Sequence, residues 1–363
     1  MHLNHDQRSA VRMLKTGRSF CVYGAAGTGK SVVRRRIAEL VPSVTLGPTG
    51  MSIADSKGMT VARFLKATPR SIACAGTMAR SMTAFPNVPG FTIIIDEAPM
   101  VATAQLLALD AGAKRVRRSH LPFGGVRVVI LGDFCQLAAP GAVTPLFDAA
   151  PIRALAPDVV TLVQQMRQGD EPALAALLHD CRRCRLSQAS ADLLLTLNRR
   201  TPRPDAVRLY ATRAEAAAHN RTRLRAHPGK AFTHNNVTLK IGVPVCVTGN
   251  IYRGGSLWLA NGARGTVVAL SATVVTVDVG GVLRPMITPA PLELGFAITV
   301  HRAQGQTYSH VTVVGTRFFA PGQLYTALSR VTGLEGLCCI DVLPEHAEIP
   351  HPVRVREYLA AHG

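Results

Sequence analysis

The chain has 363 residues, enough for two or three domains, and 47% of them are hydrophobic, which excludes a wholly disordered protein. No apolar run approaches the roughly 20 residues that a membrane span needs, and the N-terminal segment lacks the basic-then-apolar order of a secretory signal, so we expect a soluble intracellular protein, in a compartment that the sequence leaves open. The net charge of +19 favours a polyanionic partner, nucleic acid ahead of a membrane surface, although solvated arginine-rich faces would give the same charge.

Residues 1–150 alternate short apolar runs with helical patterns. Buried runs that alternate with helices are typical of a parallel sheet covered by helices. We expect strands at 19–23, 43–46, 91–95 and 126–131. Residues from about 62 to 90 break the alternation. The first predicted domain is therefore 1–150, with a short insertion at about 62–90.

A second α/β pattern begins near Val159. Within it, residues from about 230 to 290 place Val, Asn and Gly in short strands with turns, which is the pattern of a small all-β unit. We therefore predict a second α/β domain at 151–345, with a β-rich insertion at about 228–294 and a C-terminal tail at 346–363.

The strongest motif in the chain is a phosphate-binding loop, Gly24-Ala-Ala-Gly-Thr-Gly-Lys-Ser31, between an apolar strand and a helical pattern. Its glycines let backbone N–H groups close around phosphates, and the N-terminus of the following helix favours the anion. Lys30 is placed to reach the β- and γ-phosphates of ATP, and Ser31 to ligate Mg²⁺. The predicted ATP-binding residues of the loop are Gly24, Gly27, Thr28, Gly29, Lys30 and Ser31.

Two adjacent carboxylates follow the apolar run that ends at Ile95. Ligands bind at the carboxyl ends of the strands in open α/β sheets, so we expect Asp96 and Glu97 beside the loop. We assign Asp96 to the Mg²⁺ and Glu97 to the polarisation of an attacking water. Neighbouring carboxylates with these two roles fit hydrolysis better than transfer to a bound hydroxyl.

A third predicted strand, 126–131, ends in the polar turn Gly132-Asp-Phe-Cys-Gln136. Taken alone, such a turn is as often structural as functional. Because it is the third strand end with polar residues at the same edge of the predicted sheet, we place Gln136 where it can sense the γ-phosphate.

Together these motifs resemble superfamily 1 DNA helicases, specifically the PIF-type branch of superfamily 1B. Leu3–Gln7 is similar to the adenine-reading motif of that family. Gly47–Gly50, with Gly58–Thr60, is similar to a motif that contacts single-stranded DNA. The most specific likeness is the stretch from Arg118 to Leu137, which phosphate-loop enzymes in general lack.

The second half resembles the same family, with its motifs in the same order. Gln165–Arg167 and Tyr325–Arg330 are similar to motifs whose arginines reach the γ-phosphate, and Ile298–Thr307 is similar to the motif that couples DNA to nucleotide. Leu259–Gly265 is similar to the stretch around the β insertion. The resemblance covers nearly the whole chain and implies two RecA-like parallel-sheet domains in tandem, the second with an SH3-like all-β insertion.

The resemblance also implies site residues that local patterns do not identify. Gln7 and Gly305 join the expected ATP-binding set. The expected catalytic residues are Lys30, Asp96, Glu97, Gln136, Arg167 and Arg330. The expected contacts with DNA are Thr49, Thr60, Arg63 and His301.

We therefore predict an ATP-dependent DNA helicase that uses ATP and Mg²⁺ and acts on single-stranded and forked duplex DNA as a monomeric motor. The resemblance alone implies its 5′-to-3′ direction. Two alternatives stay open. One is an RNA-directed superfamily 1 NTPase or helicase, and the other is a single-strand-binding clamp that ATP switches without unwinding.

Overall fold

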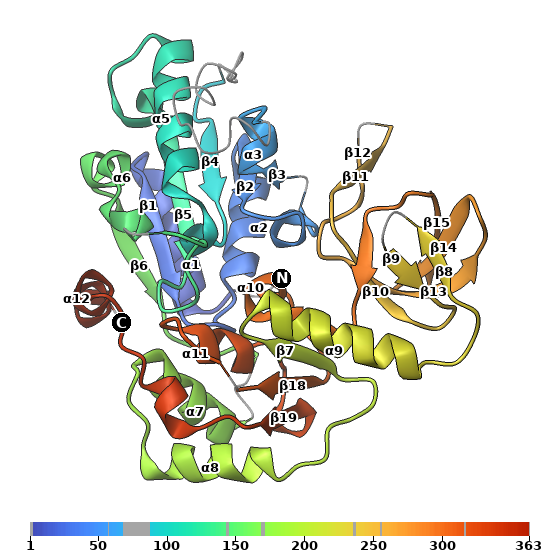
Figure 1. The fold of residues 1–363 in the computed structure, drawn as a ribbon. Helices are drawn as coiled ribbons and strands as arrows, with labels where there is room; N and C mark the ends of the chain where they lie inside the picture. Colours follow the sequence, from blue (N-terminus) through green and yellow to red (C-terminus); the bar gives the residue numbers. More distant parts are fainter. Residues whose placement is uncertain are drawn as a thin grey trace.

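The structure, a computed structural model, consists of two parallel sheets with helices around them and a smaller β unit beside them (Figure 1). It describes residues 3–56, 58–67, 88–142, 145–167, 171–234, 237–254, 256–315 and 317–362. The predicted insertion at about 62–90 lies mostly outside these described residues. Among the helices of the described part, none combines the length and the apolar character needed to cross a membrane.

The first sheet is parallel, and its strands follow the order β3-β2-β4-β5-β1-β6. They are β1 (Phe20–Gly24), β2 (Ser43–Gly47), β3 (Met59–Thr60), β4 (Thr92–Ile95), β5 (Arg127–Gly132) and β6 (Asp158–Leu162). Successive side chains of a strand point to opposite faces. In β1, Phe20 and Val22 therefore enter one hydrophobic core, while Cys21 and Tyr23 enter another. The strands predicted at 19–23, 43–46, 91–95 and 126–131 are confirmed.

Helices cover both faces of the first sheet. One face packs against α1 and α2 through Ala10, Val33 and Ile37, and the other against α5 and α6 through Leu106 and Ile152. The helical elements of this half are α1 (His5–Arg12), η1 (Met13–Thr16), α2 (Lys30–Leu40), η2 (Met51–Ile53), α3 (Val61–Phe64), η3 (Ala98–Met100), α5 (Thr103–Arg117), η4 (Pro122–Gly125), η5 (Leu146–Asp148) and α6 (Ala150–Leu155).

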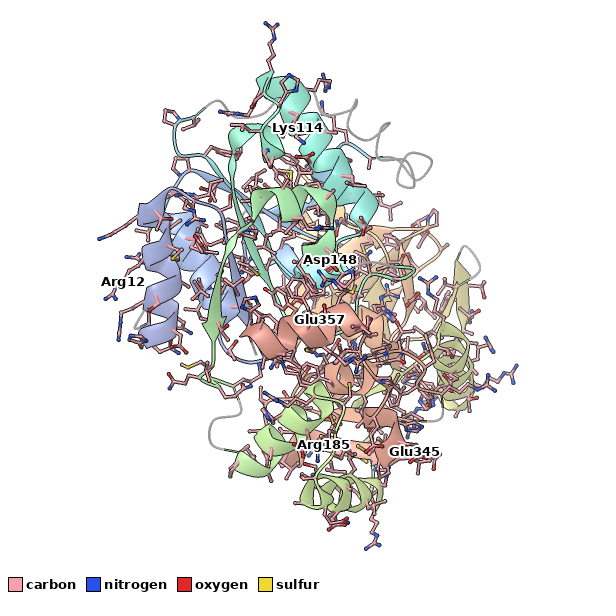
Figure 2. The ribbon with its side chains drawn as sticks, turned by 90° about the vertical axis from the view of Figure 1, so that its left-hand side faces the viewer. Arg12, Lys114, Asp148, Arg185, Glu345 and Glu357 are labelled. Carbon is pink, nitrogen blue, oxygen red and sulfur yellow. The ribbon has the colours of Figure 1, made fainter. Side chains whose placement is uncertain are left out.

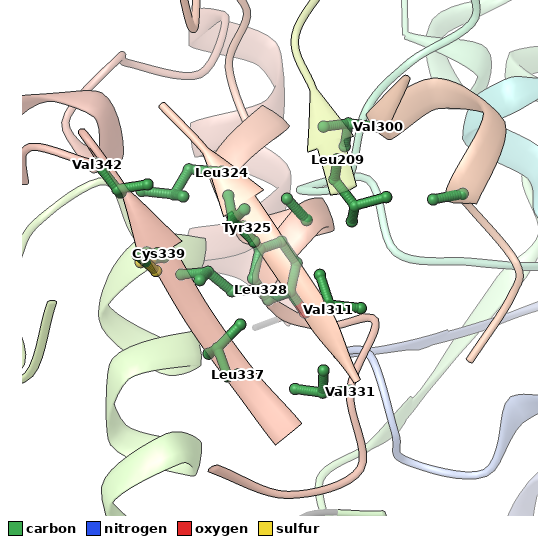
Figure 3. Packing of buried hydrophobic residues seen from close by; sticks show 14 of the residues in the cluster. Leu209, Val300, Val311, Leu324, Tyr325, Leu328, Val331, Leu337, Cys339 and Val342 are labelled. Atoms are coloured by element: carbon green, nitrogen blue, oxygen red, sulfur yellow. The ribbon is translucent and has the colours of Figure 1, made fainter. Parts of the chain in front are cut away.

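The second sheet is also parallel, with the order β17-β7-β18-β19. Its strands are β7 (Val207–Tyr210), β17 (Ala297–Thr299), β18 (Val311–Val314) and β19 (Leu337–Ile340). Its helical elements are α7 (Pro172–Arg182), α8 (Gln188–Asn198), α9 (Arg213–Ala226), α10 (Val300–Ala303), α11 (Gln323–Leu328), η6 (Leu334–Gly336) and η7 (Pro344–Ala347). Side chains such as Val311, Leu328 and Val342 fill the core between them (Figure 3). The two parallel sheets confirm the predicted fold class.

The predicted all-β insertion is confirmed as an antiparallel unit with a core of its own. Its main sheet has the order β15-β14-β13-β10-β16, and the hairpins β8–β9 and β11–β12 flank it. These strands are β8 (Phe232–His234), β9 (Val237–Leu239), β10 (Pro244–Val247), β11 (Ile251–Arg253), β12 (Ser256–Leu259), β13 (Arg264–Leu270), β14 (Val274–Val279), β15 (Val282–Ile287) and β16 (Leu292–Leu294).

The start of the second α/β pattern near Val159 needs a correction. Val159 lies in β6, and β6 pairs in parallel with β1 along its whole length. It therefore completes the first sheet and does not begin the second, so the first sheet extends beyond the predicted boundary at residue 150. The pattern of residues within a strand does not specify which neighbour it pairs with. The other predicted domain limits stay predictions.

The predicted C-terminal tail contains a helix, α12 (Val353–His362), that returns to the first half. Arg354 donates from Nε and Nη2 to the two carboxylate oxygens of Asp148, at 2.8 and 2.7 Å. Figure 2 shows Asp148 beside this helix. The ring of Tyr358 has its centroid 5.2, 5.2 and 4.4 Å from the centroids of three aromatic rings of the first half, Tyr23, Phe134 and Phe147. The end of the chain is thus fastened to the first sheet.

Tyr358→Ala should lower the free energy of unfolding by about 2–3 kcal/mol, because a partly buried ring loses its packing against the aromatic cluster. Urea unfolding curves measure this difference. Arg356→Ala, on the exposed side of α12, is the matched control and should change the free energy by less than about 0.5 kcal/mol. Equal values for the two variants would show that α12 is not docked in solution.

Candidate functional site

The phosphate loop joins β1 to α2 at the carboxyl edge of the first sheet. Gly27 and Gly29 adopt positive φ angles of 87° and 85°, which favour glycine. A Cβ on Gly29 would also collide with the side-chain amide of Gln7. Gln7 is buried in α1 and donates from Nε2 to Thr28 O at 3.4 Å. The structure therefore places Gln7, which we predicted to read adenine, against the loop.

Lys30 is the first residue of α2, and its ammonium group folds back over the loop. Nζ donates to Gly24 O at 2.8 Å and to Ala25 O at 2.9 Å. Burial lowers the pKa of Lys30, and the nearby Asp133 carboxylate opposes this change. The side chain of Ser31 is exposed beside it. Lys30 and Ser31 therefore lie together at the mouth of the loop.

Asp96 and Glu97 directly follow β4. Asp96 is buried and accepts a hydrogen bond from Glu97 N at 2.9 Å. Burial, together with the charge of Glu97, raises the pKa of Asp96 to about 7. Glu97 has a φ of 48°, in the left-handed region, so the chain turns directly after Asp96. A Cβ on Gly305 of the second half would lie 3.9 Å from Glu97 Oε1, so Gly305 and Glu97 face each other between the two halves.

A buried arginine contacts Asp96 from α2. Arg34 is 1% exposed, and its Nε lies 3.2 Å from Asp96 Oδ2. Its Nη2 donates to both carboxylate oxygens of Asp55 at 2.6 Å. Asp55 follows η2, in the segment that begins near Thr49. Arg34 therefore connects the candidate metal ligand with a segment that carries a predicted DNA contact.

The turn after β5, residues 133–137, contacts the second half of the chain. Leu137 N donates to Thr326 Oγ1 at 3.0 Å, and Gln304 Nε2 donates to Leu137 O at 3.2 Å. A Cβ on Gly322, the N-cap of α11, would collide with Cys135 O, so this close approach requires glycine. We call the packing of this turn against α11 the interdomain joint.

Arg330 follows α11 and is buried at the interdomain joint. Its Nη2 donates to Gln136 Oε1 at 3.5 Å, its Nη1 to Gln306 O at 3.2 Å and its Nε to Thr326 O at 2.8 Å. Burial lowers the pKa of Arg330, and the nearby Glu97 opposes this change. Arg330 and Gln136 were predicted in opposite halves of the chain, and the structure brings them into contact.

Arg167 approaches the same region from the segment after β6. Its Nη1 donates to Ser329 O at 3.3 Å. The preceding Met166 N donates to Gly27 O at 2.9 Å. This segment therefore lies between the phosphate loop and the turn that carries Arg330. Burial lowers the pKa of Arg167, and the nearby Glu97 opposes this change.

A cavity of about 1140 Å³ lies between the first half, the second sheet and the β insertion. Thr49 lines it from the first half, His301 from α10, and Arg213 and Arg221 from α9. Figure 1 shows α9 running beside the β insertion. Burial and the charge of Arg213 lower the pKa of His301, which favours the neutral ring. Two of the four predicted DNA contacts therefore share one cavity.

The other two predicted DNA contacts, Thr60 and Arg63, do not line this cavity. Thr60 is buried, and its Oγ1 accepts from Arg63 N at 3.2 Å, which caps α3. The guanidinium of Arg63 lies 3.6 Å from the ring centroid of Tyr252, in the hairpin β11–β12. In this conformation Thr60 stabilises a helix end, and Arg63 holds the hairpin against the first half.

Three buried residues that the sequence analysis did not assign join the site. Tyr325 Oη accepts from Ala26 N at 2.8 Å and donates to Asp133 Oδ2 at 2.6 Å. Arg182 Nε donates to Asp133 Oδ1 at 3.3 Å. The sequence offered one signal for Arg182. It lies on the apolar face of the helix α7, and a buried charge needs a partner.

Two parallel sheets that meet at one cleft, with a phosphate loop on the first and a buried arginine from the second, define a two-domain RecA-like protein of the P-loop class. A family model of PIF1-like helicases matches residues 2–143. The ATP-dependent DNA helicase PIF1 of Mus musculus is 30% identical over 401 residues, which cover 94% of this chain and 60% of that protein. The family-model match and these relatives support a relationship to PIF1-like helicases.

Two further proteins show how far the similarity extends. The ATP-dependent DNA helicase Pif1 of Bdellovibrio bacteriovorus is 26% identical over 387 residues, which cover 93% of this chain and 87% of that protein. The Pif1 helicase from Bacteroides, solved in complex with ADP-AlF3 and ssDNA, shares the fold with a TM-score of 0.82 at 22% identity, over 99% of this chain and 97% of that one. The chain spans about 60% of the length of the mouse protein.

Asp55→Asn should lower the free energy of unfolding by about 1–2 kcal/mol, because Arg34 stays buried while its strongest hydrogen-bond acceptor loses its charge. Urea unfolding measures the change. Glu39→Gln is the matched control, since it removes the exposed ion pair that Glu39 forms with Arg36 on the same helix at 2.9 Å. That variant should differ from wild type by less than about 0.5 kcal/mol. If the two variants unfolded alike, the Arg34–Asp55 pair would contribute no more than a surface pair.

Proposed function

We propose that this chain is an ATP-dependent DNA helicase that translocates along single-stranded DNA. The observation that carries the proposal is the contact of Arg330 from the second half with Gln136 of the first, next to the phosphate loop. A nucleotide on that loop would lie between the two halves, so hydrolysis would change how closely they meet. The similarity to named DNA helicases supports the same activity.

The nucleotide chemistry divides among side chains of both halves. Lys30 would exchange its two loop carbonyls for the β- and γ-phosphate oxygens of ATP. Glu97 would polarise the attacking water, and Gln136 would sense the γ-phosphate. Arg330 and Arg167 would stabilise the negative charge that develops on the transferred group, an effect that is large where water is excluded. Gln7 would contact the adenine, and Gly305 would bind the nucleotide from the second half, the ATP-binding roles that the family resemblance implies.

Ser31 and Asp96 fit the ligand preferences of Mg²⁺, because a hydroxyl and a carboxylate are hard oxygen donors. Over the residues that the structure describes, no three His, Cys, Asp or Glu side chains form a metal cage. That finding fits a cation whose other ligands are phosphate and water. When bound, Mg²⁺ would neutralise charge on the phosphates. Arg34 and Glu97 N hold the Asp96 carboxylate in its position.

The cavity between the first half, α9 and α10 would hold the DNA strand. Arg213 and Arg221 would contact backbone phosphates, and the net charge of +19 would add salt-dependent affinity. His301 begins the segment that leads to Gly305 and to Gln306, whose carbonyl accepts from Arg330. Movement at the nucleotide would therefore change the position of a DNA contact. Repeated gripping and release of this kind would step the protein along a strand, in the 5′-to-3′ direction by resemblance to the family.

Lys30→Ala and Arg330→Ala should each reduce ATP hydrolysis stimulated by single-stranded DNA by at least about 100-fold, because each removes a positive charge that faces the transferred phosphate. A coupled phosphate-release assay measures the rate. Arg185→Ala removes an exposed arginine from the connection after α7 (Figure 2) and should leave the rate near wild type. Persistence of the stimulated rate in both site variants would contradict the assignment.

The same proteins decide between the helicase and its alternatives on forked duplexes. We expect wild type to separate a DNA fork that carries a 5′ single-stranded tail, and Lys30→Ala to leave that fork intact. Stimulation by RNA but not by DNA would support an RNA-directed enzyme instead. Hydrolysis without strand separation on any fork would support the single-strand-binding clamp.

Arg213→Ala and Arg221→Ala should each weaken binding to a labelled single-stranded oligonucleotide measured without nucleotide. Each should also reduce the slope of log affinity against log salt by about 0.7, the value for one phosphate contact with a single strand. Fluorescence anisotropy at several salt concentrations gives the slope. Arg225→Ala changes an exposed arginine of the same helix that does not line the cavity, and it should keep the wild-type slope. Unchanged slopes in both cavity variants would place the strand elsewhere.

A further inference from the structure

The hydroxyl of Tyr325 joins the two halves at the phosphate loop itself. Tyr325 lies in α11 of the second half and is 2% exposed. Its Oη contacts Ala26 N at 2.8 Å and Asp133 Oδ2 at 2.6 Å. Ala26 belongs to the phosphate loop after β1, and Asp133 belongs to the turn after β5. One hydroxyl group of the second half therefore connects two loops of the first.

The direction of both hydrogen bonds follows from the charge of Asp133. Burial alone would raise the pKa of Asp133, but Arg182, Lys30 and the hydrogen bond from Tyr325 lower it overall, so the carboxylate is an anion. An ionised carboxylate only accepts hydrogen bonds, so the Tyr325 hydroxyl must donate to it. The oxygen of that hydroxyl is then left to accept from Ala26 N–H. Both functions of the hydroxyl are used, and phenylalanine could supply neither.

The same short helix also places Arg330. Arg330 N donates to Ala327 O at 3.2 Å, and Arg330 Nε donates to Thr326 O at 2.8 Å, so the arginine moves with α11. Withdrawal of α11 would therefore remove Tyr325 from the loop and Arg330 from Gln136 together. It would also leave Asp133 with one cation fewer, since Arg182 comes from the second half, and Lys30 would be the remaining cation near it.

We propose that Tyr325 is a positioning residue that makes the nucleotide-binding shape of the phosphate loop depend on closure of the two halves. This inference rests on the proposed function in one respect, that the loop binds ATP. With α11 in place, Ala26 N–H has an acceptor and Asp133 is satisfied without Lys30, which leaves the lysine available to phosphate. With α11 withdrawn, Asp133 competes for Lys30 and the loop binds nucleotide more weakly.

The test is Tyr325→Phe, which keeps the ring and removes only the hydroxyl. Binding of a fluorescent ADP analogue, measured without DNA and without turnover, should weaken by about ten-fold, because hydrogen bonds to charged groups are among the stronger ones. The KM for ATP should rise by a similar factor, while affinity for single-stranded DNA without nucleotide should change by less than about two-fold. The matched control is Tyr358→Phe, which removes a partly buried hydroxyl that contacts Cys21 Sγ at 3.5 Å, away from the loop; its ADP affinity should equal that of wild type. ADP affinity within two-fold of wild type in a folded Tyr325→Phe protein would overturn the proposal.

A second variant keeps the proposal testable if Tyr325→Phe does not fold. Asp133→Asn preserves the size and an acceptor but removes the charge that holds Tyr325 and Arg182 of the second half at the loop. Loss of the closed arrangement should outweigh the loss of a competitor for Lys30, so ADP binding should weaken by at least about three-fold. In the double variant the two effects on ADP binding should be less than additive, because both act through one hydroxyl. Full additivity, or unchanged ADP binding in Asp133→Asn, would overturn the proposal.

These measurements use no DNA, so a protein that fails to separate strands but shows the Tyr325 effect would contradict only the proposed helicase activity. A wild-type protein that binds no ADP would contradict the proposed function at its first step.

Discussion

The site depends on one buried anion at the interdomain joint. Asp133 is 1% exposed, and the two side chains that bind its oxygens, Tyr325 and Arg182, come from the other half. Separating a buried ion from its partners is strongly unfavourable, whereas an intact buried pair adds little net stability compared with apolar contacts. We infer that Asp133 acts mainly by selecting one closed arrangement of the two sheets. That selection matters because Arg330 must take one fixed position relative to the phosphate loop.

The parallel arrangement of the first sheet explains why the candidate site residues follow only a few strands. The carboxyl ends of β1, β4 and β5 lie at one edge of the first sheet, so the loop, Asp96 and Gln136 gather there. The second sheet contributes α10 and α11 to the opposite wall. Two short connections then run from the nucleotide site toward the cavity: the segment from His301 to Gly305, and the ion pairs of Arg34 with Asp96 and with Asp55, which lies a few residues after Thr49. Arg34 is buried along the second route, and packed interiors transmit displacement better than solvated loops do.

Some of this arrangement is predictable from local sequence and some is not. The strand, loop and helix at the phosphate loop form one continuous stretch, so its chemistry and its neighbours at the strand ends could be predicted from pattern alone. Arg330 was placed by resemblance only, and Tyr325 was not assigned at all, because their partners lie about 200 or more residues away in the chain. The strand near Val159 was placed in the wrong sheet, since alternation identifies a strand but not the strand it pairs with.

Thr60 shows the same limit at a smaller scale. Its hydroxyl is used by the backbone of α3, a contact that depends on where that helix begins. Helix α12 lies in the segment that we predicted only as a C-terminal tail, and its docking on Tyr23 and Asp148 depends on the folded first sheet. Local chemistry thus predicts which residues can react, and the long-range contacts decide which of them meet.

Our central claim is that a nucleotide on the phosphate loop and a strand in the cavity act on the same joint. The most direct test measures the affinity for single-stranded DNA with and without a non-hydrolysable ATP analogue, and the affinity for that analogue with and without DNA. Linkage requires the same factor in both directions. We predict a factor of about five or more in the wild-type protein, lost in Arg330→Ala. A factor of one in the wild-type protein would contradict the claim.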